Sequence, residues 1–278
     1  SLVMSLEAHA QIEAMFDAAK HGDLGNLVRL VELTSNIGGG VTARDAIRDS
    51  LLHWTCLAGH IECARWLIEH GAEVNAANLY LSVPLHLASM YNHLELVRLL
   101  LFSNARVDAR NNVRHTALHL AAQAGHTAVA ELLLANGANV NALSSVRRSP
   151  LHFAAAANHI ELAMLLLEHR ANVDQTNSVQ HTPLAMACIE GNTEIAELLV
   201  RKRANIEATN SVLQRPLHLA AAKNRAQVVE LLLSLGADPT TRTRYGQSAA
   251  ELVTSSDPSL KATLERAASE HPQVPSTE

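Results

Sequence analysis

Residues Thr116–Asn141, TALHLAAQAGHTAVAELLLANGANVN, have the pattern of two short helices placed back to back. Thr116 can cap the first helix, in which apolar residues recur at helical spacing. Gly125 can take the left-handed conformation that ends this helix, and Gly137 can end the second in the same way. The second helix carries a stripe of valine and leucine that is too wide for one helical hairpin to bury. The stretch therefore needs neighbouring units that bury this apolar stripe.

The neighbours are copies of the same pattern at a period of 33 residues. The histidine of the first helix recurs at His53, His86, His119, His152 and His218, and Ala185 is the one exception. The leucine before it recurs without exception, at Leu52, Leu85, Leu118, Leu151, Leu184 and Leu217. A fixed period of this length, with two helices in each unit, predicts an all-α solenoid of stacked helix-turn-helix units.

The repeat resembles the ankyrin repeat. Ser149-Pro150-Leu151-His152 and Arg215-Pro216-Leu217-His218 stand where that family has Thr-Pro-Leu-His, and Gly71, Gly137 and Gly236 stand at its Gly-Ala. The resemblance implies short β-hairpin fingers between the units and a concave groove lined by the finger tips and the first helices. It also implies a protein or peptide partner, no catalytic role and no cofactor.

In this interpretation residues 6–268 form one elongated, cooperative ankyrin-repeat array. An amino-terminal cap at residues 6–44 precedes six 33-residue repeats at 45–242, and a carboxy-terminal cap follows at 243–268. The glycine-rich residues 35–40 are expected to form a flexible connection. Residues 269–278 contain two prolines and no apolar period, which predicts a disordered tail.

Composition narrows the class of function. A net charge of −5 argues against a nucleic-acid binder, which would present a strongly basic face. Three cysteines form no even framework and indicate a reducing, intracellular setting, cytoplasmic or also nuclear. No apolar run has the length of a membrane span, and no signal peptide opens the sequence. The chain is expected to be a monomer, and its first residue, Ser1, leaves open that it is a fragment.

Neither metal binding nor catalysis is expected. The sixteen histidines include a regular ladder with one member in each repeat, and a ladder cannot converge on one ion as a zinc site requires. In the ankyrin family this histidine is structural and hydrogen-bonds the backbone of the adjoining turn. Cys56 and Cys188 fall at small, buried positions of the repeat and lack an orienting acid. We therefore expect no catalytic residue, no metal ligand and no cofactor.

The resemblance places a set of apolar residues on the concave surface, where they are candidate partner contacts: Ile47, Leu57, Leu79, Tyr80, Met90, Tyr91, Ile189 and Tyr245. Exposed aromatic residues and methionine are typical interface anchors. The alternative is that Leu57 or Met90 packs inward between repeats.

A series of arginines follows the fingers or their edges: Arg110, Arg114, Arg147, Arg148 and Arg215. On a chain of negative net charge, such a row would steer an acidic or phosphorylated segment toward the groove. The alternative is a solvated row that only keeps the finger edges soluble.

The fingers depart from the family at the turn position that usually carries glycine, where this chain has Leu81, Arg114, Arg147, Gln180 and Leu213. Without glycine a turn does not freely use positive φ, which predicts a different, more extended turn. Arg170 and Arg203 replace the glycine that ends a second helix, so those two helix ends are expected to be strained or reshaped. Asn92, Asn158 and Asn224 replace the glycine that ends a first helix, and asparagine tolerates the left-handed region.

The stretch Leu67–Asn75 also fits the pattern of ankyrin asparagines that are hydroxylated, with Asn75 as the target. Taken together, the sequence favours a non-catalytic interaction scaffold that binds a protein or peptide in its groove. Two alternatives stay open. In one, the chain is the targeting or regulatory region of a larger enzyme. In the other, it is an assembly chaperone or a subunit of a large complex.

Overall fold

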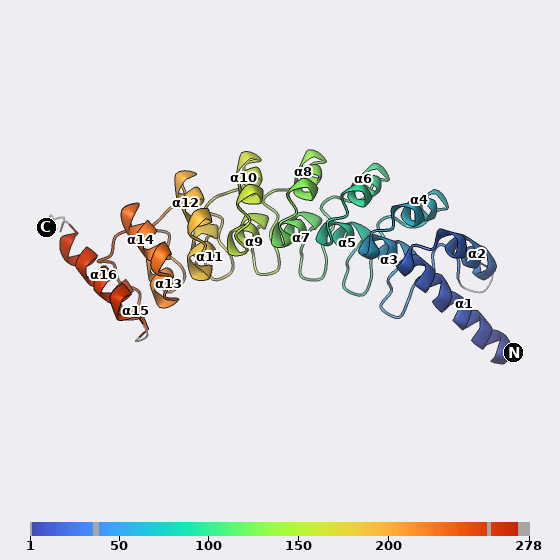
Figure 1. The fold of residues 1–278 in the computed structure, drawn as a ribbon, viewed down its shortest axis with the longest axis horizontal. Coiled ribbons are helices and arrows are strands. Elements are labelled where there is room, and N and C mark those ends of the chain that lie inside the picture. The colour runs from blue at the N-terminus through green and yellow to red at the C-terminus, as the bar shows by residue number, and fades with distance from the viewer. Residues whose placement is uncertain (1, 36–38, 255–256, 272–278) are drawn as a thin grey trace. The chain divides into compact units, whose positions relative to one another are not determined.

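The computed structural model describes residues 2–35, 39–254 and 257–271. The chain divides into two compact units, Ser1–Asn139 and Val140–Glu278, called here the first and the second unit. Each unit is a row of helical pairs with loops that project from one side (Figure 1). The predicted all-α fold is confirmed.

The first unit contains α1 to α8. Their bounds are α1 Leu2–His21, α2 Leu24–Thr34, α3 Leu51–Ala58, α4 Ile61–Glu69, α5 Pro84–Met90, α6 Leu94–Phe102, α7 Ala117–Ala124 and α8 Thr127–Ala135. The inner helices α3, α5 and α7 pack side by side, and each also packs on the outer helix that follows it. The long helix α1 packs on α2 and α3 and closes one end of the row.

The second unit repeats this plan with α9 to α16. Their bounds are α9 Pro150–Ala156, α10 Ile160–Glu168, α11 Pro183–Glu190, α12 Thr193–Arg201, α13 Pro216–Ala222, α14 Ala226–Ser234, α15 Ala249–Leu252 and α16 Pro258–Glu270. The inner helices α9, α11, α13 and α15 pack in order, and α16 packs on α15 at the far end. Helix α16 continues through Glu270, past the predicted start of the tail at residue 269, while residues 272–278 and residues 36–38 of the predicted connection lie outside the described part.

The helices bury the positions that recur every 33 residues. Leu52 and Leu85 of the inner helices are 0% and 1% exposed, and Leu67 and Leu100 of the outer helices are completely buried. Burying one leucine is worth about 1.5 to 3 kcal/mol, so the ladder of leucines is the main source of stability in each row. The inner helices end where the sequence predicts, with φ of 89° at Gly59 and 60° at Asn92.

The loops that project from each unit are hairpins in which three residues connect two hydrogen-bonded flanking residues. We call them fingers: residues 45–49, 78–82 and 111–115 in the first unit, and 144–148, 177–181, 210–214 and 243–247 in the second. In finger 78–82 the Asn78 N–H donates to Ser82 O (3.0 Å) and the Leu81 N–H donates to Asn78 O (3.0 Å). This is a β-turn followed by one left-handed residue. The fingers are thus hairpins, although the only β-bridge among the described residues joins Arg44 and Ser50.

The prediction of a more extended turn in the glycine-free fingers is wrong. The φ angles are 54° at Leu81, 60° at Arg114, 58° at Arg147, 64° at Gln180 and 59° at Leu213, all in the left-handed region. The physical reason is a side chain at the start of each turn. In finger 78–82 the Asn78 Oδ1 accepts hydrogen bonds from the N–H groups of Tyr80 (2.9 Å) and Ser82 (3.0 Å), which close the turn without glycine.

The other predictions about backbone strain are confirmed. Arg170 and Arg203 both have a φ of 66°, so the two helix ends keep the glycine conformation with a large side chain. Asn158 and Asn224 have φ of 59° and 52°, as expected of asparagine at such ends. A left-handed residue other than glycine costs about 1 to 2 kcal/mol, so strain recurs along both rows.

The recurrent histidines join each inner helix to the next finger. The Nδ1 of His53 accepts from the Ser50 N–H (3.1 Å), and its Nε2–H donates to Ser82 O (2.9 Å). In the second unit His152 makes the same pair of bonds, with the Ser149 N–H (3.1 Å) and His181 O (3.0 Å). Burial lowers the pKa of His53 and brings that of His152 to about 4, so both rings stay neutral. The structural interpretation of these histidines is confirmed.

Candidate protein-binding surface

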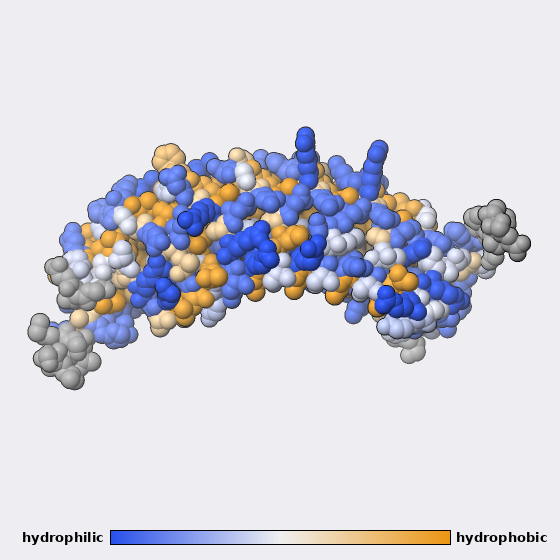
Figure 2. Space-filling view, turned by 180° about the vertical axis from the view of Figure 1, so that it is seen from behind, coloured by the Kyte–Doolittle hydropathy of each residue, from blue (hydrophilic) through white to orange (hydrophobic). Residues whose placement is uncertain are grey.

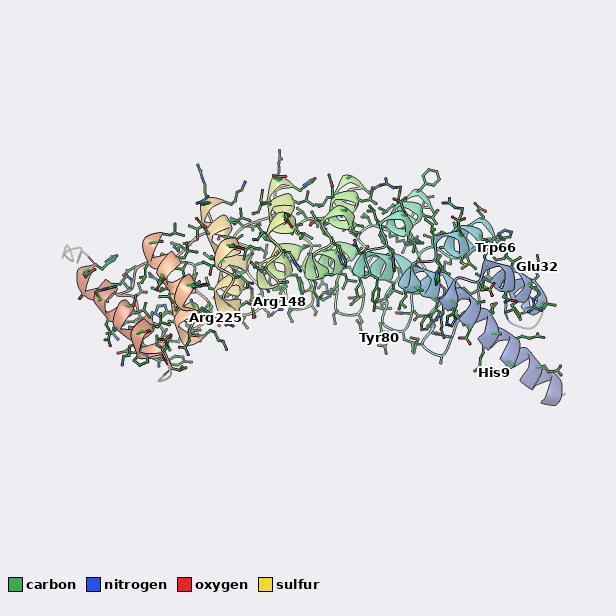
Figure 3. All side chains as sticks on the ribbon, in the orientation of Figure 1. His9, Glu32, Trp66, Tyr80, Arg148 and Arg225 are labelled. Carbon is green, nitrogen blue, oxygen red and sulfur yellow. The ribbon has the colours of Figure 1, made fainter. Side chains whose placement is uncertain are left out.

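Exposed apolar side chains gather on two fingers of the first unit. We call Ile47, Leu79, Tyr80 and Leu81 the finger patch; their exposed fractions are 37%, 55%, 53% and 54%. Figure 3 shows Tyr80 at the finger edge, on the opposite side of the unit from Trp66 of α4. The finger patch therefore belongs to the face formed by the fingers and inner helices.

A second exposed pair lies at the carboxyl end of α5. Met90 is the last residue of this helix and Tyr91 follows it, with exposed fractions of 42% and 48%. The finger patch precedes the same helix, which starts at Pro84. Seven helical residues span roughly 10 Å, so the pair and the finger patch mark two ends of one inner helix.

The finger that carries Tyr80 is held from both sides. The Leu79 N–H donates to Ile47 O (3.0 Å) of the preceding finger, and the Asn112 N–H of the next finger donates to Tyr80 O (2.8 Å). Asn78 closes the turn from within, and its Nδ2–H donates to the buried Asp49 Oδ1 (2.7 Å). The phenol is consequently presented on a fixed backbone, which lowers the entropy lost when a partner binds.

The two candidate arginines of the first unit, Arg110 and Arg114, are available for a partner. Arg110 and Arg114 are both exposed, and neither forms an ion pair with the described part of the chain. They belong to the third finger or its edge, and this finger is hydrogen-bonded to the one that carries Tyr80. Positive charge thus lies one finger away from the apolar anchors.

Leu57 and Ile189 are only half-buried, and their backbone carbonyls already have partners. Leu57 O accepts from His93 Nε2 (3.1 Å), and Ile189 O accepts from Arg225 Nε (3.0 Å). These bonds tie an inner helix to the loop that precedes the next outer helix. Both residues are weaker candidates for partner contact than the finger patch.

The candidate residues of the second unit differ in their exposure and in the contacts that their side chains make within the chain. Arg215 bonds the carboxylate of Glu207, so its charge is committed within the fold. The guanidinium of Arg148 lies 5.9 Å from the centre of the Phe153 ring. Arg147 is exposed on the same finger, and Tyr245, on the last finger, is 72% exposed. Figure 3 shows Arg148 and Arg225 on this unit.

Sequence reasoning treated Leu81 and Leu213 only as turn anomalies, yet both are prominent apolar surface, with exposed fractions of 54% and 46%. The signal that could have found them is the residue three positions earlier. Asn78 and Asn210 each accept two backbone hydrogen bonds within their fingers. An asparagine at this place predicts a closed turn whose left-handed residue points its side chain outward.

Two of the three cysteines, Cys56 and Cys188, lie buried in inner helices. Burial raises the pKa of the Cys56 and Cys188 thiols, so they are not nucleophiles at neutral pH. Within the described ranges no three His, Cys, Asp or Glu side chains are placed to share a metal ion, and no helix there is long and apolar enough to cross a bilayer. In Figure 2 hydrophilic residues are interspersed with apolar ones on the face seen from behind.

Comparison with known families defines the class of protein. The model described as "Ankyrin repeats (3 copies)" matches residues 15–111, 85–177 and 171–243, which is most of the chain. The chain belongs to the ankyrin-repeat family. Ankyrin repeats are in general protein–protein interaction modules and typically non-catalytic. A search of curated proteins found no match.

Asn75, the predicted hydroxylation target, is half-buried and bridges two repeats of the first unit. Its Nδ2–H donates to Asn104 O (3.1 Å), and its Oδ1 accepts from the Arg106 N–H (2.8 Å). Both bonds hold the Asn75 side chain within the fold. Hydroxylation of Asn75 stays a prediction.

Proposed function

We propose that this chain is a protein-binding scaffold whose first unit holds one segment of a partner across α5. The segment contacts the finger patch at one end of the helix and Met90 and Tyr91 at the other. The observation that carries the proposal is the exposure of Tyr80 on a finger fixed from both sides. Rigid, exposed aromatic side chains are the residues that dominate binding energy in interfaces.

Charge supplies the second element of recognition. Arg110 and Arg114 have no ion-pair partner in the described residues and lie one finger from Tyr80. A carboxylate or phosphate on the partner, placed beside its apolar anchors, would pair with either guanidinium. The proposed partner segment is therefore apolar and acidic, or apolar and phosphorylated.

The proposal is tested by affinity capture from native cell extract, read by mass spectrometry. The wild type is compared with the Tyr80→Glu, Tyr91→Glu double variant and with Phe102→Glu. Phe102 is the matched control because it is 88% exposed but lies at the end of the outer helix α6. We expect the double variant to lose the captured partner and the control to keep it, with all three melting at the same temperature. Identical capture by the double variant would overturn the proposal.

The contribution of charge is measured on the partner so identified. Reversal of both arginines, Arg110→Glu with Arg114→Glu, should weaken binding by about 10-fold or more at low salt. The wild type itself should lose affinity as ionic strength rises, because exposed charges are screened. Equal affinity of both proteins at all salt concentrations would remove the acidic segment from the proposal.

A further inference from the structure

A cleft of about 810 Å³ lies in the first unit between α1 and the first finger. One side is a stripe along α1 that includes Ile12, Glu13 and Phe16, and the other side is formed by residues 43–46. Figure 3 shows His9, which also lines the cleft, on the side of α1 toward the fingers. The cleft is separate from the finger patch, because the second finger lies on the other side of the first.

The first finger has an open hydrogen-bonding edge that faces this cleft. In four of the later fingers the second residue donates its N–H to a carbonyl of the preceding finger, as Leu79 does to Ile47 O (3.0 Å) and Asn112 to Tyr80 O (2.8 Å). The residue at this position of the first finger is Ala46. It lines the cleft, is exposed, and its N–H has no partner in the described residues. The repeat therefore places a donor where no finger precedes it.

Most charges that line the cleft are already committed. Arg44 pairs with Glu73 (2.9 Å), and Lys20 pairs with Asp17 (3.5 Å) and lies 4.3 Å from the centre of the Trp54 ring. The carboxylate of Asp45 accepts from Trp54 Nε1 (2.9 Å) and from backbone N–H groups of its own finger.

One anion remains. Among the described residues Glu13 forms an ion-pair contact only with His9 (3.4 Å), and this ring offers a full positive charge only when protonated. Glu13 is also exposed, so it can turn toward a cation that enters the cleft. The cleft thus combines a free backbone donor, an apolar floor and an exposed carboxylate whose contact is with a histidine.

We propose that this cleft binds an extended segment of a protein partner that carries a lysine or arginine beside an apolar residue. A backbone carbonyl of the segment accepts the Ala46 N–H, as the carbonyl of a preceding finger would. The apolar side chain lies on Ile12, and the cation pairs with Glu13. Main-chain pairing of this kind gives affinity, and the two side chains give specificity. The site goes beyond the proposed function, because it favours a basic segment. It shares one finger with the finger patch, the finger that carries Ile47, but Ile47 itself does not line the cleft.

The test uses a phage-displayed library of random 12-residue peptides, selected on the full chain. Selected sequences are synthesised with a fluorophore, and their affinities are measured for four variants. Ala46→Pro removes the N–H, and proline is favoured at the second position of such a turn. Glu13→Lys reverses the free anion, Glu7→Lys is the matched control on the same helix outside the cleft, and Tyr80→Glu with Tyr91→Glu disables the other surface. Amide exchange of Ala46 is followed by NMR with and without peptide.

The proposal expects peptides enriched in a basic residue next to an apolar one. Their affinity should fall about 10-fold in Ala46→Pro, the loss of one hydrogen bond, and by a similar factor in Glu13→Lys. Glu7→Lys and the tyrosine variant should bind as the wild type does, and peptide should slow exchange of the Ala46 amide. If Ala46→Pro proves unstable, Glu13→Lys and the exchange measurement still decide.

Three results would overturn the proposal. The library yields no binding peptide, or the peptides bind Ala46→Pro and Glu13→Lys as tightly as the wild type. In the third, sedimentation shows that the chain self-associates and that Ala46→Pro abolishes this association. That result would mean that a second copy of the chain fills the cleft. Loss of binding only in the tyrosine variant would assign the peptides to the finger patch and support the proposed function instead.

Discussion

At the scale of single residues, the fingers are closed by carboxylate, amide and hydroxyl side chains, and only the last described finger has glycine at the left-handed position. Asn111 in the first unit and Asn177 in the second each accept two backbone N–H groups from their own finger. These bonds determine the turn so strongly that arginine or glutamine is held at a φ near 60°. The strain is retained where a side chain projects from the finger tip. The side chain at such a position can contact a partner, whereas glycine would provide no side chain there.

This strain predicts the effect of Leu81→Gly. The substitution relieves a left-handed leucine, at a cost in unfolded-chain entropy, and should raise the free energy of unfolding by about 0.5 to 1 kcal/mol. Leu81 is 54% exposed, so little buried area is lost. Urea denaturation measures the change. The control is Leu81→Ala, which keeps the strain and removes the same apolar atoms except the Cβ; a glycine variant no more stable than alanine would contradict the prediction.

At the scale of helices and fingers, the two kinds of element are joined by one imidazole in each repeat, and α11 lacks it. Ala185 stands at the histidine position, so no ring reaches Gln214 O from this helix. His181 Nε2 lies 3.1 Å from the Asn210 Nδ2 and supports the same finger from another direction. The Thr182 N–H has no acceptor in the described residues, unlike the Ser149 N–H one repeat earlier.

Restoring the ring by Ala185→His should therefore stabilise the second unit. The imidazole can accept from the Thr182 N–H and donate to Gln214 O, as His152 does in its own repeat. Two buried hydrogen bonds, offset by the ordering of one side chain, predict a gain of about 1 kcal/mol. Urea denaturation and slower exchange of the Thr182 amide would show it. Ala185→Leu fills the same space without hydrogen bonds, and equal stability of the two variants would refute the prediction.

The helices could be predicted from the sequence because each depends on local signals and on a period. Leu118 and His119 recur at a fixed step, so their burial follows from the repeat alone. The turn type could not be predicted, because positive φ at a residue other than glycine depends on a side chain that closes the turn. The stabilising contact of Asn78 spans only two and four residues, but its geometry becomes visible only in the folded finger. The cleft beside Ala46 was also beyond sequence reasoning, because it depends on how α1 packs against a finger.

At the scale of the whole molecule, the buried imidazoles make stability depend on pH. Burial lowers the pKa of His53, His86 and His218, and lowers that of His152 to about 4. The unfolded chain binds protons near pH 6.5, while the folded chain keeps these rings neutral. The unfolded state thus holds more protons in this window. Stability is complete above about pH 6.5 and is lost as the pH falls toward 4.

The size of this loss can be measured. His152 alone should cost about 3 kcal/mol between pH 6.5 and 4, and the other buried rings add to it in the same direction. Urea denaturation at pH 7.5, 6 and 5 should give a steadily falling free energy of unfolding. His152→Gln should flatten the slope, whereas His9→Gln, at an exposed position, should not. A free energy that stays constant from pH 7.5 to 5 would rule out this account.

Inside the array the histidine ties between repeats span a fixed number of residues, and only the ties at the two ends, made by His60 and His218, differ. His53 bonds a carbonyl 29 residues ahead, and His93 bonds one 36 residues behind. Inside the array both ties repeat with the 33-residue period, so a whole duplicated or deleted repeat meets equivalent partners in its new neighbours. An insertion of another length changes only the ties that span it, as at the amino-terminal end, where His60 bonds Lys20 O 40 residues behind. Such a gene can lengthen or shorten by whole repeats, while its finger tips are free to diverge.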